Sequence, residues 1–198
     1  MKIGIFCSAN NNIEREYFER TEELGRWCAE NGHSIVFGGC NMGLMGCIAG
    51  AYHQGFKSDS HIQESSKVQE GSMVRKGDLI GVVPRIIERG GRMSEWLTIH
   101  IPCDNLSDRK DLILAHSDVV VALPGGIGTL DELFTVAAAK TIGYHQKHII
   151  LYNINGFWNT LIALLEDLEQ RSMIRGNWKD YISVANSFEE LTTLLKSI

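Results

Sequence analysis

The chain of 198 residues is long enough for one domain with a sizeable core, and its 44% hydrophobic and 22% charged residues are typical of a globular protein. A formal net charge of -5 at pH 7 gives no general attraction to nucleic acid or to anionic membranes, and no apolar run approaches the roughly 18 residues of a membrane span. The five cysteines form no CxxC pair, which argues against a disulfide framework or structural zinc and favours a cytoplasmic location.

Strand and helix patterns alternate along the chain. Short apolar runs predict strands at 2–6, 34–37, 79–83, 97–102, 118–123, 148–153 and 181–185, the first being a strand rather than a signal peptide. Apolar residues at helical spacing predict helices from Ile13 to a stop at Gly32, over 44–54 and 106–116, from the glycines near 126 to about Gly143, and over 157–170 and 187–198. This alternation predicts an α/β fold, a doubly wound parallel sheet in a single domain over 1–198.

One segment departs from this alternation. Residues 57–76, "KSDSHIQESSKVQEGSMVRK", are polar and show neither a helical nor an alternating period. We therefore expect a long excursion there, either a surface loop or an added hairpin, and loops of this length often have a function.

Glycine-rich loops point to a ligand site. Ligands of doubly wound sheets bind beyond the carboxyl ends of strands, which here are followed by loops after Phe6, Phe37 and Leu123. The third loop, "LPGGIGTLDEL", contains glycines that let a ligand approach the backbone, and Thr129 is expected to open a helix whose free N–H groups favour phosphate. The alternative is structural, because Thr129 and Glu132 have the spacing of a T-x-x-E capping box.

Two further segments are candidates for the same site. Gly39 lies in "GGCNMGLMG" after the second strand, and Ser8 follows the first. Neither glycine loop matches the P-loop pattern or G-x-G-x-x-G after the first strand, which disfavours ATP and NAD chemistry. Arg109 and Lys110, in "SDRKDL", could clamp a phosphate, or could be a solvated basic pair flanked by Asp108 and Asp111.

These segments together resemble the Lonely Guy family, the cytokinin riboside 5'-monophosphate phosphoribohydrolases. The resemblance covers roughly Lys2 to Ile174, and also rests on "GYHQKHIILYNINGFWNTLIALLEDL". The family's defining pattern, an Arg-Lys dipeptide followed by P-G-G-x-G-T-x-x-E, is complete in Arg109-Lys110 and in Pro124 to Glu132. The segment Arg85 to Leu97 matches poorly.

The resemblance implies a Rossmann-like homodimer that hydrolyses the N-glycosidic bond of a nucleoside 5'-monophosphate, without metal or cofactor. Arg109 and Glu132 would be the catalytic pair. The residues implied in binding the nucleotide are Lys110, Gly125, Gly126, Ile127, Gly128, Thr129, Leu130 and Asp131. Family members are often labelled possible lysine decarboxylases, but the sequence contains no recognisable pyridoxal-phosphate site built around a Schiff-base lysine.

The residue types suit this chemistry. Breaking the C–N bond builds positive charge on the ribose, which a carboxylate such as Glu132 stabilises while it activates water. If Glu132 closed the capping box instead, its carboxylate would turn away from the sugar. The competing hypothesis is a nucleotide-binding carrier or regulator that does not hydrolyse its ligand. The base remains open between adenine, isoprenoid-substituted adenine and another purine.

Overall fold

A computed structural model describes residues 1–60 and 77–198 of the chain. The polar excursion expected at 57–76 therefore lies outside the described residues, except at its start. There the expectation of a loop is wrong, because helix α2 (Gly43–Ser60) continues through residue 60.

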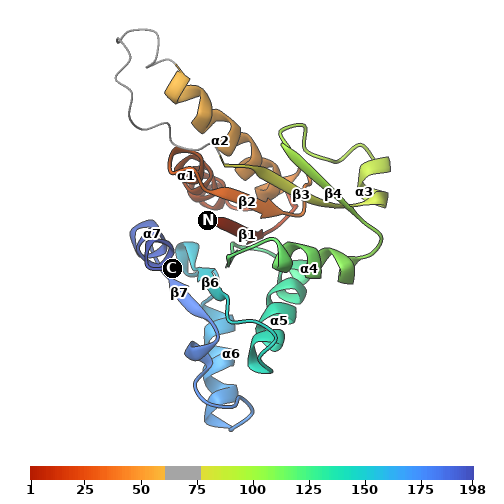
Figure 1. Cartoon of the computed structure of the whole chain (residues 1–198). Helices are drawn as coiled ribbons and strands as arrows, with labels where there is room; N and C mark the ends of the chain where they lie inside the picture. Colours follow the sequence, from red (N-terminus) through yellow and green to blue (C-terminus); the bar gives the residue numbers. More distant parts are fainter. Residues whose placement is uncertain (61–76) are drawn as a thin grey trace.

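Seven parallel strands form one sheet in the order β4-β3-β2-β1-β5-β6-β7 (Figure 1). All seven predicted strands are present, as β1 (Lys2–Phe6), β2 (Ser34–Phe37), β3 (Leu79–Pro84), β4 (Ile99–Cys103), β5 (Val119–Ala122), β6 (His148–Tyr152) and β7 (Ser183–Ala185). The predicted doubly wound α/β fold is thus confirmed. Strands β2 and β5, on either side of β1, are buried along their whole length because helices cover both faces of the sheet.

The helices form two layers, one on each face of the sheet. Alternate strand residues such as Ile5 and Val121 pack with α1 (Arg15–Glu30), α2 and α7 (Phe188–Lys196). The residues between them, such as Phe6 and Val120, pack with α4 (Leu106–Ala115), α5 (Ile127–Thr141) and α6 (Asn159–Gln170). Among the described residues, no helix is both long and apolar enough to cross a membrane.

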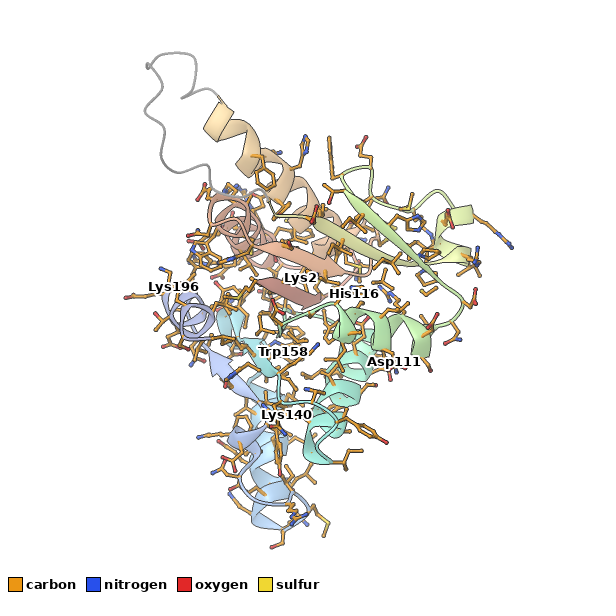
Figure 2. All side chains as sticks on the ribbon, in the orientation of Figure 1. Lys2, Asp111, His116, Lys140, Trp158 and Lys196 are labelled. Carbon is orange, nitrogen blue, oxygen red and sulfur yellow. The ribbon has the colours of Figure 1, made fainter. Side chains whose placement is uncertain are left out.

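Three short helices complete the chain, and none was predicted from the sequence. They are α3 (Arg85–Arg89) and the 3-10 turns η1 (Ile154–Gly156) and η2 (Trp178–Asp180). The η1 turn delays α6, which was expected from residue 157, to Asn159. At that turn the Asn153 side chain accepts a hydrogen bond from the Trp158 backbone N–H. The indole of Trp158, labelled in Figure 2, donates a hydrogen bond to the Ala122 carbonyl of β5.

The order of the strands places one loop pair at the topological switch point. The chain runs outward from β1 to β4 and then returns to place β5 on the other side of β1. The segments after these two strands are tied together, since Leu123 N–H donates to Phe6 O over 2.9 Å and Ser8 N–H to Pro124 O over 3.1 Å. The loops after β1 and β5 therefore leave the sheet side by side, where such folds bind their ligands.

Candidate functional site

Arg109 and Glu132 meet beside the switch point. Arg109 comes from the first half of α4 and Glu132 from the second turn of α5, and Arg109 Nη1 lies 3.3 Å from Glu132 Oε1. The two side chains are only 14% and 7% exposed. The structure thus brings together, as a buried ion pair, the two residues that the motif resemblance implied to be catalytic.

The structural alternative, a capping box at Thr129 and Glu132, is wrong, and so is the expectation that Thr129 opens the helix. Helix α5 begins at Ile127, its N-cap is Gly126 with no side-chain cap, and Leu130 N–H donates to Gly126 O over 3.0 Å. Thr129 therefore lies inside the first turn rather than opening the helix. The Glu132 carboxylate is not used at the helix start and is free to face Arg109.

The environment of Glu132 alters its acidity. Burial raises the pKa of this carboxyl from 4.5 to about 7, because the charged form loses water. The charge of Arg109 lowers this pKa, the charge of Asp131 raises it, and the charge of Lys110 lowers it by less than that of Arg109. Cys7, which follows β1, also faces the carboxyl, and burial together with Glu132 holds the pKa of its thiol well above the ordinary range. Glu132 is consequently poised to take up or release a proton near neutral pH.

Gly38, which the sequence analysis did not select, makes room for Arg109. A Cβ on Gly38 would overlap the guanidinium of Arg109, mainly at Nη2. Arg109 Nε is buried and has no hydrogen-bond partner among the described residues. The guanidinium therefore lies close to the backbone after β2, with Nη2 nearest to Gly38. The signal was available, since Gly38 begins the same glycine run as Gly39.

The predicted residues Gly39 and Ser8 shape the neighbouring loops. Gly39 has a φ of +69°, and a Cβ there would overlap Val83 of β3. Its carbonyl accepts a hydrogen bond from Ser94 N–H over 2.8 Å. Ser8 Oγ accepts from Asn10 N–H over 3.0 Å, and Ser8 O accepts from Leu44 N–H at the start of α2. Both residues thus fix the loop backbone at the carboxyl edge.

The glycines of the loop after β5 differ in what surrounds them. A Cβ on Gly125 would overlap the Thr129 side chain, so this glycine is required by packing within the loop. By contrast, a Cβ on Gly126 or Gly128 would have no described heavy atom within 4 Å. The backbone at these two positions is therefore open at the N-terminus of α5, where a helix favours an anion.

The remaining predicted binding residues surround this helix start. Ile127 is almost fully exposed, and Leu130 packs partly against the core. Lys110 Nζ lies 2.8 Å from both carboxylate oxygens of Asp131. The alternative of a solvated Arg-Lys pair flanked by Asp108 and Asp111 is thus wrong, because both basic residues pair with carboxylates of α5.

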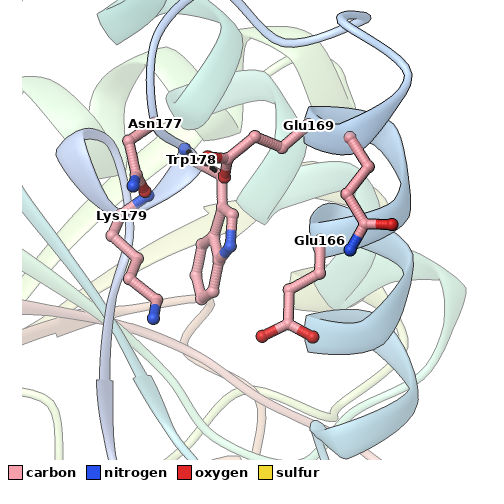
Figure 3. A pocket seen from close by; sticks show the side chains of 6 residues that line it. Glu166, Glu169, Asn177, Trp178 and Lys179 are labelled. Atoms are coloured by element: carbon pink, nitrogen blue, oxygen red, sulfur yellow. Dashed lines mark hydrogen bonds between the residues drawn. The ribbon is translucent and has the colours of Figure 1, made fainter.

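Elsewhere in residues 1–60 and 77–198, no ion pair is as deeply buried as that of Arg109 and Glu132. An open pocket of about 430 Å³ lies at the end of α6 and beside η2 (Figure 3). Glu169, in its wall, accepts a hydrogen bond from Trp178 N–H, and Lys179 Nζ lies over the Trp178 ring. Among the described residues, no group of three or more His, Cys, Asp or Glu could hold a metal ion. The carboxyl edge at β1 and β5 is therefore the candidate site.

Comparison with known protein sequences agrees with the motif resemblance. The family model described as "Possible lysine decarboxylase" matches residues 66–195. The chain is 27% identical over 195 residues to the probable cytokinin riboside 5'-monophosphate phosphoribohydrolase LOGL2 of Oryza sativa subsp. japonica, covering 98% of this chain and 72% of that protein. It is also 27% identical over 195 residues to cytokinin riboside 5'-monophosphate phosphoribohydrolase LOG4 of Arabidopsis thaliana, covering 98% and 81%.

Solved structures share the architecture. The molybdenum cofactor binding protein from Rippkaea orientalis superposes with a TM-score of 0.67 at 22% identity, covering 99% of this chain and 95% of that one. The molybdenum cofactor carrier protein from Chlamydomonas reinhardtii gives a TM-score of 0.67 at 20% identity, covering 99% and 96%. At these identities the likeness shows the fold alone.

Proposed function

The chain belongs to the family described as possible lysine decarboxylases, the family of the Lonely Guy proteins, and from this premise we propose that it hydrolyses a nucleoside 5'-monophosphate. The C–N glycosidic bond breaks, water adds to the ribose carbon, and the base leaves with a proton, which gives free base and ribose 5-phosphate. The observation that carries the proposal is the buried pair of Arg109 and Glu132 beside the open N-terminus of α5.

Glu132 is the residue that we assign to the ribose. Its carboxylate stabilises positive charge that develops on the sugar ring and accepts a proton from the attacking water. A general base works best when its pKa lies near the working pH, and burial brings that of Glu132 to about 7. Arg109 orients the substrate through the part of its guanidinium that stays exposed beside Glu132.

The phosphate is assigned to the start of α5. The backbone at Gly126 and Gly128 is open, and the first N–H groups of a helix attract an anion without a basic surface. This suits a chain whose net charge is -5, because recognition then depends on a local site. Thr129, packed on Gly125, holds the turn in which these N–H groups lie.

Lysine decarboxylation is less well supported by the site. A Schiff-base lysine must reach the neutral amine form to attack a cofactor aldehyde. Lys110, the lysine next to Arg109, is instead held between both oxygens of Asp131. The pair of a buried carboxylate and a guanidinium fits glycosidic hydrolysis better.

The proposal includes assembly as a homodimer. Large apolar side chains are exposed at both ends of α5, namely Ile127, Ile142 and Tyr144. We infer that a second copy of the chain covers these side chains, which removes apolar surface from water. Light scattering after size-exclusion chromatography tests this part, and a mass of one chain, 22.1 kDa, would contradict it.

Product analysis tests the reaction directly. The protein and its Glu132→Gln variant are incubated with AMP and with isopentenyladenosine 5'-monophosphate, while calorimetry measures binding of each nucleotide. We expect base and ribose 5-phosphate from the wild type only, with binding retained in the variant. Binding by both proteins without release of base would overturn hydrolysis and favour a carrier. The ratio of the two rates defines the preference for the base.

A further inference from the structure

Two ion pairs join α4 to α5 side by side. Arg109 and Lys110 are adjacent on α4, and Glu132 and Asp131 are adjacent on α5, so the pairs lie in register. The Arg109–Glu132 pair is the deeper one. The Lys110–Asp131 pair is nearer to the surface, with Lys110 only 14% exposed and Asp131 52% exposed.

The first half of α4 has no fully buried side chain. Ile113, in its second half, is the only buried residue of this helix. Lys147 Nζ donates to the Leu114 carbonyl at the far end, and Asn105 caps the first turn from within the same segment. The half that carries Arg109 is therefore held by the packing of Arg109 against Gly38, by Asp104 N–H, which donates to Asp108 Oδ2, and by polar contacts with α5.

The geometry of the Lys110–Asp131 pair is suited to holding α4 against α5. Lys110 Nζ contacts both carboxylate oxygens at 2.8 Å, which restrains the ammonium more than one contact would. Because Lys110 is largely buried along its stem, removal of Asp131 would leave its charge poorly compensated. A Lys110 ammonium that is held in one position also restrains the turn of α4 that carries Arg109.

We propose that Lys110 and Asp131 form an interhelical brace that holds Arg109 opposite Glu132, and that Lys110 is a positioning residue rather than a ligand of the phosphate. The kinetic part of this inference rests on the proposed hydrolysis. The positional part does not, and can be measured without substrate.

The acidity of Glu132 gives a readout that distinguishes the brace from simple electrostatics. Acting only as charges, Lys110 lowers the Glu132 pKa and Asp131 raises it, so loss of either would shift this pKa in opposite directions. If the pair is a brace, loss of either residue lets Arg109 move away, and the pKa of Glu132 rises in both variants. The other groups facing this carboxyl, Arg109 and Cys7, are unchanged in these variants.

The experiment compares Lys110→Met, Asp131→Ala and the exchanged double variant Lys110→Glu with Asp131→Lys. Carboxyl carbon NMR measures the pKa of Glu132 in each protein, and Asp111→Asn, which removes an exposed charge from α4, is the matched control. We expect a higher pKa in both single variants and recovery in the exchanged variant. A fall of the pKa in Asp131→Ala would overturn the brace.

Kinetics with AMP complete the test. We expect kcat to fall roughly tenfold to a hundredfold in both single variants, because a displacement of about 1 Å can cost a hundredfold, and to recover in the exchanged variant. A rise in KM in Lys110→Met alone, with no recovery on exchange, would instead assign Lys110 to the phosphate. If no variant and not even the wild type releases base, the proposed function fails while the NMR result still decides the brace.

Discussion

Helices α4 and α5 supply the two halves of the candidate pair, yet they are anchored in opposite ways. Five residues of α5 are buried, namely Thr129, Glu132, Leu133, Val136 and Ala137, whereas α4 buries only Ile113. Glu132 is therefore held by a helix packed into the core, and Arg109 by one held largely through polar contacts. Changes on α5 should therefore act on the chemistry of the carboxylate, whereas changes around α4 should act on the position of the guanidinium.

The largest effect is expected from Glu132→Gln, which tests the chemical side of the comparison. The amide keeps the shape of the side chain but cannot stabilise the ribose cation or accept a proton. We expect kcat for AMP to fall by about a hundredfold to ten-thousandfold, the usual range for loss of an acid–base group, with KM nearly unchanged. An unaltered kcat in a folded variant, checked by circular dichroism, would remove Glu132 from the chemistry.

The next largest effect is expected from Gly38→Ala, because Gly38 makes room for the Arg109 side chain. In Gly38→Ala the new methyl group overlaps the guanidinium, so Arg109 must move away from Glu132. We expect kcat/KM to fall by about a hundredfold, as for a displacement of about 1 Å. The control is Gly50→Ala in α2, where a Cβ meets no described atom and alanine favours the helix by about 0.5–1 kcal/mol. Equal activity in the two variants would show that Gly38 does not position Arg109.

Stability should depend on pH through Glu132. Its folded pKa, about 7, lies above the value of 4.5 for a free carboxyl, so the folded state binds the proton more tightly. The stabilisation is complete below about pH 4.5 and is lost as the pH rises through about 7, with an upper limit of about 3 kcal/mol. Urea unfolding between pH 5 and pH 8 measures this loss. Glu132→Gln should show a smaller decline, and parallel curves would contradict the raised pKa.

The smallest effect is expected at the open end of α5. In Gly128→Ala the added methyl group meets no described atom, so the melting temperature should change by no more than a few degrees. If phosphate approaches this backbone closely, KM for AMP should rise several-fold, by about 1 kcal/mol of lost binding. Binding of adenosine, which has no phosphate, is the control. A KM equal to that of the wild type would place the phosphate elsewhere.

The sequence by itself determined the strand and helix alternation, and with it the doubly wound fold. The runs at β2, β3 and β5 carry the clearest pattern, because strands buried on both faces read as continuous apolar runs. The motif pair also singled out Arg109 and Glu132, which the fold brings together as an ion pair. Local spacing left two alternatives at Thr129, since the T-x-x-E pattern describes a capping box equally well as two residues inside a helix.

Only the tertiary structure decided how these residues are used. Helix α5 begins at Ile127 because Gly126 accepts the first helical bond, and this turns Glu132 toward α4. Gly38 and Arg109 are far apart in sequence. They meet only because the fold brings the segment after β2 next to the side chain from α4. The raised pKa of Glu132 likewise comes from burial, a property of the packed chain that no motif contains.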